Sequence, residues 1–95
     1  MYNEEKQLLD QAVFGEQIKE FLLSDLGQFI LHKGEQERDA ALSQLSIVDP
    51  TDVKAITKLQ NDIQVIEHIK YWLSEAIQEG LQAANVLDAH RENYE

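Results

Sequence analysis

Two histidines and two glutamates could form a metal site if the two halves of the chain pair antiparallel. His32 would then lie opposite His68, with Glu35 and Glu67 near them. Imidazole and carboxylate groups are ligands for zinc and iron, and such a site would suit a metal-dependent oxidase. Helical di-iron proteins, however, carry Glu-x-x-His motifs, and Val65 stands three residues before His68. We therefore expect solvated histidines, with no metal and no cofactor.

Other catalytic chemistry finds little support in the residues. The chain has no cysteine, and its serines lack the glycine-framed turn of a nucleophile elbow. No glycine-rich loop follows a strand, so a phosphate cradle is not expected. Paired carboxylates are common in any acidic protein and carry little meaning alone. The sequence predicts a protein that is not an enzyme.

The charge of the chain excludes some partners. Eighteen acidic and eight basic residues give a formal net charge of -10, and neither sign is clustered. Direct binding to nucleic acid requires clustered Lys and Arg, so it is not expected. No run of about 18 apolar residues is present, so no membrane span is expected. The N-terminal MYNEEKQLLD lacks the apolar region of a secretory signal.

The single proline marks where a long helix should begin. In the sequence SIVDPTD, Asp49 suits an N-cap, Pro50 suits the first helical position, and Asp52 suits the positive end of a helix dipole. We predict a helix over about 50–87. A heptad seam with 3-4-3-4 spacing runs along it, as in coiled-coil packing: Ile56, Leu59, Ile63, Ile66, Lys70, Leu73, Ile77, Gly80, Ala84 and Leu87.

This helix is too apolar for a single neighbour. A second stripe lies beside the seam and widens the apolar arc to roughly 200°. We expect the N-terminal segment or another subunit to cover this stripe. Its residues are Val65, Ile69, Trp72, Ala76 and Ala83.

The stretch HKGEQERD, residues 32–39, decides the architecture of the first half. It has no hydrophobic side chain, yet most of its residues are good helix formers. Read as helix, it joins a stripe in which small residues recur every seven positions, at Gly27, Gly34 and Ala41. We predict one continuous helix over about 16–47. The alternative, a loop at 32–36, remains open at this point.

A hairpin folded at Pro50 would place residue i near residue 100 − i. The full stripe on the first helix would be Gly27, Leu31, Gly34, Arg38, Ala41, Leu45 and Val48. Small residues then face large ones, which is what a packed seam requires. The expected pairs are Gly27 with Leu73, Gly34 with Ile66, Ala41 with Leu59, Phe21 with Gly80, Arg38 with Asp62, and Lys33 with Glu67.

Two aromatic residues on the second helix have different expected roles. We expect Trp72 to be buried in the core opposite Gly27. The alternative is that Trp72 is exposed and is a hot spot for binding a partner. Tyr71 projects to the polar side and is the better candidate for an exposed aromatic.

The predicted fold is all-α and forms a single domain over residues 1–95. It consists of a long antiparallel helical hairpin, 16–47 and 50–87, with a short N-terminal helix over 1–14 that ends at Gly15. Residues 88–95 should be a frayed tail. The wide apolar arc predicts a homo-oligomer, most simply a dimer forming a four-helix bundle.

Four motifs within residues 26–87 resemble a group of small helical proteins of tailed phages and prophages. These are G-x-x-L (here with Ile30 in place of Leu), V-D-P-x-D at 48–52, Q-N-x-I at 60–63, and W-L-x-x-x-I-x-x-G-x-x-A at 72–83. The resemblance covers about two thirds of the chain and carries no site residues. Because such genes often stand near head-assembly genes, it implies a role in the particle or its assembly.

The leading functional prediction is therefore a non-enzymatic phage structural or assembly accessory protein. It would act through helix–helix contacts with copies of itself and with an unidentified phage or host protein, in the host cytoplasm or the virion. The alternative is an acidic inhibitor that imitates nucleic acid and occupies the site of a host DNA- or RNA-binding protein.

Overall fold

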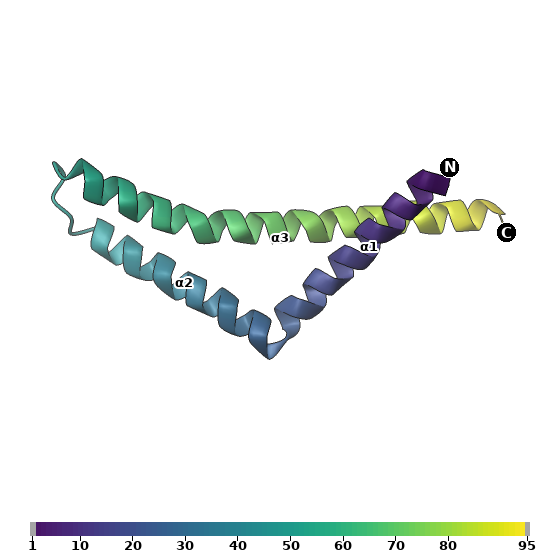
Figure 1. Cartoon of the computed structure of the whole chain (residues 1–95), viewed down its shortest axis with the longest axis horizontal. Helices are drawn as coiled ribbons and strands as arrows, with labels where there is room; N and C mark the ends of the chain where they lie inside the picture. Colours follow the sequence, from purple (N-terminus) through teal and green to yellow (C-terminus); the bar gives the residue numbers. More distant parts are fainter. Residues whose placement is uncertain (1, 95) are drawn as a thin grey trace.

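Three helices account for nearly all of the residues that the structure describes. The computed structural model describes residues 2–94, and describes their side chains over 3–91. Helix α1 is Tyr2–Leu23, α2 is Asp25–Leu45 and α3 is Val53–Tyr94. The helices α1 and α2 form a V whose two ends meet α3, while the apex of the V stands away from it (Figure 1). The prediction of an all-α fold is confirmed.

The heptad seam of the second half is the packed side of α3. All ten predicted seam positions from Ile56 to Leu87 are buried or half-buried. Leu59 and Ile66 are among the most buried hydrophobic side chains, and Gly80 is buried as well. Periodicity therefore located the inner face of a helix of 42 residues.

The stretch HKGEQERD, residues 32–39, which has no hydrophobic side chain, is helical. Helix α2 runs through it without a break, so the loop alternative at 32–36 is wrong. The predicted stripe from Gly27 to Val48 is buried or half-buried at all seven positions. The pairing of Gly34 with Ile66 is confirmed, since a Cβ on Gly34 would lie 2.4 Å from Ile66 Cδ1.

Substitution of Gly34 tests this contact. The first atom that a new Cβ meets is the mobile end of an Ile side chain, so Gly34→Ala should be nearly neutral, with helix propensity offsetting the crowding. Gly34→Leu should lower the free energy of unfolding by about 2 kcal/mol, because no rotation of Ile66 makes room for four carbons. Urea unfolding at one fixed protein concentration measures both. Equal stability of the two variants would show that α2 and α3 do not meet here.

The predicted continuous helix over 16–47 is wrong, because the chain turns sharply at Ser24. The Phe21 carbonyl accepts hydrogen bonds from Ser24 N at 3.1 Å and from Ser24 Oγ at 2.5 Å. Ser24 Oγ in turn accepts from Gly27 N at 3.0 Å, which makes Ser24 the N-cap of α2. The Gln28 side-chain amide donates to the Leu22 carbonyl. Residues 21–28, called the corner below, thus satisfy the end of one helix and the start of the next.

Gly15 does not end a short N-terminal helix, contrary to the prediction. Helix α1 continues through it to Leu23, and Gly15 is buried where α1 crosses α3. A Cβ on Gly15 would lie 3.1 Å from the Cα of Gly80 and 3.2 Å from the Ala76 carbonyl oxygen. This glycine permits close approach of two backbones. The predicted contact of Phe21 with Gly80 is replaced by Gly15 with Gly80.

The turn at Pro50 lies outside the helix rather than in its first turn. The Asp49 carboxylate accepts from Thr51 N at 2.8 Å and from Thr51 Oγ at 2.7 Å, and these bonds lower the pKa of Asp49. Asp52 is the N-cap of α3, since its carboxylate accepts from Ala55 N at 3.1 Å. Asp at the first position and Pro at the second favour a β-turn over a helix start.

The far end of α3 also differs from the prediction. We expected the helix to end at residue 87 and residues 88–95 to be frayed, but α3 reaches Tyr94. Residue 95 lies outside the described part. Leu87 is the last seam residue, and the side chains of residues 88–91 beyond it are exposed.

Among the described side chains, two ion pairs link α2 to α3, and neither is one of the predicted pairs. Arg38 Nη1 lies 2.9 Å from Glu67 Oε1, and Lys70 Nζ lies 3.7 Å from Glu35 Oε1. The predicted pairs of Arg38 with Asp62 and of Lys33 with Glu67 are wrong, because long side chains reach diagonally across the seam. The hydrogen bond from Arg38 lowers the pKa of Glu67.

Candidate protein-interaction surface

The chain buries few hydrophobic side chains for its length. Among the described side chains, the buried hydrophobic ones are Ile18, Ala41, Leu59, Ile66 and Ala83, and two of these are alanines. No described large side chain is fully buried. Packed cores supply most of the stability of a small domain. This chain on its own leaves that contribution incomplete.

The overall dimensions agree with an incomplete core. The radius of gyration is 19.4 Å, against about 12 Å for a compact domain of this length. The accessible surface is 7598 Å², whereas a compact monomer of 10.9 kDa exposes roughly 5,600 Å². The excess is larger than the ~800 Å² that one partner contributes to a standard protein–protein interface.

The second apolar stripe of α3 is covered along only half of its length. Toward the C-terminus, Ala83 is 2% exposed and Ala76 is half-buried, because α1 crosses α3 there. Toward the N-terminus, Val65, Ile69 and Trp72 remain exposed. The N-terminal segment, one of the two elements expected to cover this stripe, therefore covers its C-terminal half. The other half faces solvent.

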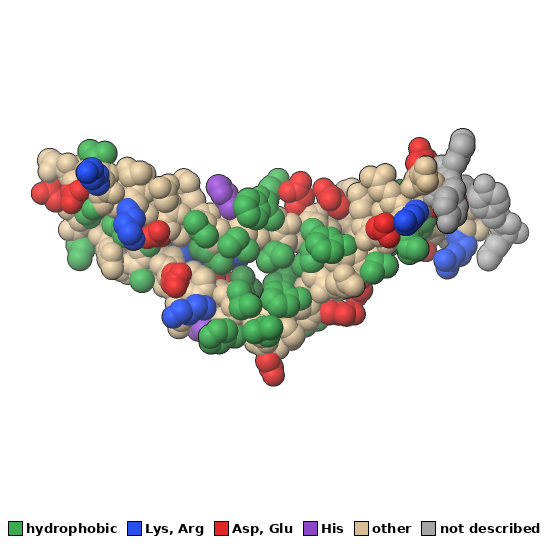
Figure 2. Space-filling view, in the orientation of Figure 1, with side chains coloured by type: hydrophobic (Ala, Val, Ile, Leu, Met, Phe, Trp, Pro, Cys, Tyr) green, Lys and Arg blue, Asp and Glu red, His purple; other side chains and the backbone are tan. Residues whose placement is uncertain are grey.

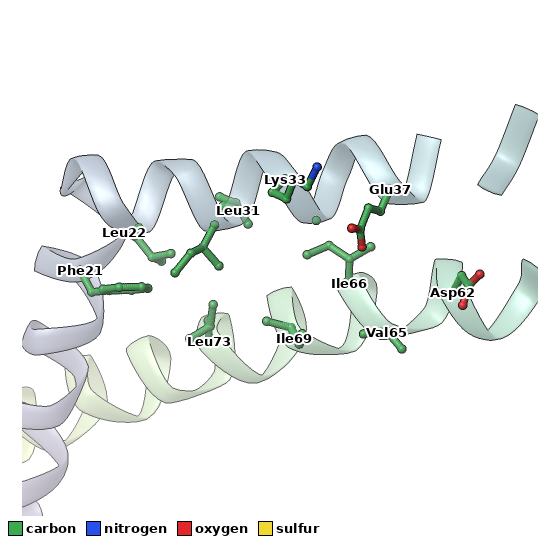
Figure 3. A pocket seen from close by; sticks show the side chains of 13 residues that line it. Phe21, Leu22, Leu31, Lys33, Glu37, Asp62, Val65, Ile66, Ile69 and Leu73 are labelled. Carbon is green, nitrogen blue, oxygen red and sulfur yellow. The ribbon is translucent and has the colours of Figure 1, made fainter. Parts of the chain in front are cut away.

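A cavity of about 270 Å³ lies inside the V, between all three helices. Phe21 and Leu22 reach it from α1, and Leu73 projects toward them from α3 (Figure 3). Ten of its thirteen lining residues are hydrophobic or glycine; the charged ones are Lys33, Glu37 and Asp62. Its volume is below the usual range of small-molecule pockets, about 300–1,000 Å³, and suits protein side chains better.

The mouth of this cavity is apolar. Val65 is 58% exposed and Ile30 is 51% exposed, so the cavity opens to solvent between α2 and α3. We call the mouth and its continuation along α3 the central apolar face, formed by Phe21, Ile30, Val65, Ile69 and Trp72. Figure 2 shows hydrophobic side chains gathered over the middle of the molecule on all three helices, with charged side chains around them and at both ends. An exposed apolar patch of this kind, rimmed by polar residues, marks an interaction site.

A second hollow continues the mouth toward the hairpin turn. It is lined on α2 by Glu37, Ala40, Ala41 and Gln44, and on α3 by Lys58, Leu59, Asp62 and Val65. It shares Glu37, Asp62 and Val65 with the first cavity. The two hollows form one groove along the α2–α3 pair.

The prediction that Trp72 belongs to the core is wrong for the single chain. Trp72 is 62% exposed, and its indole stacks loosely on His68, with ring centroids 6.2 Å apart and ring planes at 29°. Tyr71 is 63% exposed on the other side of the helix, as expected. The helix that should have covered Trp72 bends away at the corner.

The three small residues of α2 do not share one environment. Ala41 is buried beside Leu59, and Gly34 meets Ile66, as predicted. Gly27 is buried too, but a Cβ added to it would lie nearest to the Phe21 carbonyl oxygen rather than to Leu73. Its small size therefore serves the corner and not the seam.

The histidines show no arrangement for metal chemistry. His32 and His68 are both exposed, and the described residues contain no group of three or more His, Asp or Glu side chains placed to hold a metal ion. No helix in the described part of the chain combines the length and apolar character needed to cross a membrane.

An exposed stripe on α2 was not predicted from the sequence. It has 4-3-4-3-4 spacing, which is a heptad pattern that was visible in the sequence but was overshadowed by the inner stripe. All six positions are exposed, and three of them line the cavity. We call it the outer stripe of α2: Leu26, Ile30, Lys33, Glu37, Ala40 and Gln44.

Comparison of the chain with protein-family models, with curated proteins and with solved structures gave no match. The function must therefore be inferred from the geometry described above.

Proposed function

We propose that this chain is a non-enzymatic structural or assembly accessory protein that acts through helix–helix contacts with other proteins. One observation carries the proposal: the central apolar face leaves Val65, Ile69 and Trp72 exposed next to an apolar cavity. Burial of such a surface is a dominant driving force for protein association. The resemblance to phage proteins supplies the setting of the proposal, which is a tailed phage particle or its assembly in the host cytoplasm.

The same surface favours this function over the acidic inhibitor. An imitation of nucleic acid presents carboxylates in rows on one face. Here the groove between α2 and α3 is mainly apolar, and the only acidic side chains among its described lining residues are Glu37 and Asp62. The surface thus supports contact with another helix better than contact with a basic protein site.

Trp72 and Tyr71 provide a matched test of the proposal. The two aromatics are neighbours with almost equal exposure but lie on different sides of α3. Trp72→Asp should weaken association by about 30-fold or more, as expected for an aromatic hot spot, because it places a carboxylate on the apolar face. Tyr71→Asp should leave association unchanged.

The measurement is the mass and composition of the tagged chain isolated under native conditions from cells that express its source genome. Wild type and Tyr71→Asp should carry a stoichiometric protein partner, whether another copy or a different protein, whereas Trp72→Asp should not. A wild-type chain isolated as a lone monomer would overturn the proposal. An unchanged complex with Trp72→Asp would do so as well.

A further inference from the structure

We infer that the groove between α2 and α3 binds α2 of a second copy of this chain, antiparallel and across a two-fold axis near residue 35. The inference rests on the proposed function and makes it more specific, because it names the partner and the register. Three features of the described chain point to a second copy: the symmetry of the outer stripe of α2, two unpaired opposite charges at its centre, and the area left exposed.

The outer stripe of α2 is complementary to itself. In an antiparallel pair centred on residue 35, residue i of one copy faces residue 70 − i of the other, and all six stripe positions pair within the stripe. Ile30 then faces Ala40 of the other copy, a large residue against a small one. Leu26 faces Gln44 at each end. A two-fold interface requires this kind of self-complementary patch.

The central pair of the stripe carries opposite charges. Lys33 and Glu37 line the cavity, and in the described part of the chain neither takes part in an ion pair or side-chain hydrogen bond. Across the two-fold axis, Lys33 of each copy faces Glu37 of the other, which gives two such contacts in the dimer. Polar pairs at seam positions fix the register of paired helices at some cost in stability. These charges also offset the repulsion between two chains that each carry a formal charge of -10.

The groove runs along most of the length of α2. The cavity and the second hollow together follow α2 from Gly27 to Gln44 and α3 from Lys58 to Leu73. An α2 helix from another copy would cover Ile30, Val65 and Ile69, which are the exposed residues at the mouth. The accessible surface exceeds that of a compact monomer by roughly 2,000 Å². One side of a standard interface needs ~800 Å², so the two-fold contact fits within the excess.

Charge reversal tests the partner and the register together. Lys33→Glu places two Glu residues opposite each other at both central contacts, and Glu37→Lys places two Lys residues there. Each variant alone should dimerise about 100-fold more weakly than wild type, since opposed like charges cost several kcal/mol. An equal mixture of the two variants should form a heterodimer, and the double variant K33E/E37K should regain the homodimer.

Sedimentation velocity at about 50 µM chain, a concentration at which dimers of micromolar affinity are populated, gives the readout. Lys6→Glu and Glu75→Lys are the controls, because they change the net charge equally on exposed surfaces outside the groove, and both should dimerise like wild type. A monomeric wild type would overturn the inference. The inference would also be overturned if both charge-reversal variants dimerised as strongly as the wild type, or if the equal mixture formed no heterodimer. The Trp72 experiment decides separately whether the proposed function holds with another partner.

Discussion

Gly27→Ala should open the corner between α1 and α2 and lower the free energy of unfolding by about 3 kcal/mol, the upper end for overpacking. A Cβ at position 27 would lie 1.8 Å from the Phe21 carbonyl oxygen, 2.7 Å from the Phe21 carbonyl carbon and 3.1 Å from the Leu22 Cα. All three are backbone atoms, so no side-chain rotation relieves the overlap. The same Phe21 oxygen accepts the hydrogen bonds of Ser24, so moving it also loosens the cap of α2.

The helix content should not fall with the stability. Ala is a better helix former than Gly, so the relaxed form is a straighter α1–α2 segment in which the two helices no longer both meet α3. Urea unfolding followed by circular dichroism measures the loss, and small-angle scattering should give a radius of gyration above the 19.4 Å of the bent form. Gly34→Ala is the control, because it makes the same change in the same helix at a site where the neighbour can rotate. Equal stability of the two alanine variants would contradict the corner.

Gly80→Leu should separate α1 from α3 and cost about 3 kcal/mol as well. A Cβ on Gly80 would lie 2.9 Å from the Gln11 carbonyl oxygen and 3.0 Å from the Gly15 Cα, so even the first carbon has no room. Further atoms must push the backbone of α1 outward. The buried side chains Ile18 and Ala83 then lose their cover.

Hydrogen exchange distinguishes this outcome from general unfolding. With Gly80→Leu, the amides of α1 and of the C-terminal half of α3 should exchange faster, while those of α2 and of α3 near Leu59 and Ile66 keep more of their protection. Leu81→Ala, at an exposed position next to Gly80, serves as the control and should change little. Uniform loss of protection along α3 would contradict a local crossing.

Association makes both measurements depend on concentration. If a second copy occupies the groove, the unfolding midpoint of the wild type rises with protein concentration by mass action. The variants must therefore be compared at one fixed concentration. That concentration is chosen low enough for the wild type to be monomeric, so that a loss of stability reports on the fold and not on a lost partner.

The sequence by itself determined which faces of the helices turn inward. The 3-4 spacing along α3 and the small-residue stripe along α2 each identified side chains that the structure buries or half-buries, without an exception at the seam positions. Periodicity is a local property, since residues three and four apart lie on one side of a helix whatever it packs against. The same reasoning identified the helical nature of HKGEQERD and its contact at Gly34, because good helix formers and a recurring small residue coincided there.

The positions of the helix ends were harder to predict from the sequence. Ser24 followed by Asp25 is a start signal for a helix, but the apolar residues that continue on both sides of it favour one unbroken helix. At Pro50 the error was one of choice: Asp49 and Asp52 are both acceptable caps, and only the hydrogen bonds of the turn select Asp52. Such choices differ by about 1 kcal/mol, which is too little for the sequence pattern to resolve.

Only the tertiary structure decided how much of each face is covered. The bend at Ser24 sends α1 across the C-terminal half of α3, which buries Ala83 and leaves Trp72 in solvent, although both belong to one stripe. Gly15 and Gly80 are ordinary helical glycines in the sequence, and in the fold they allow the backbones of α1 and α3 to approach closely. Coverage depends on where a helix is directed after it turns, and that direction is fixed by contacts between residues far apart in the chain, which no local pattern contains.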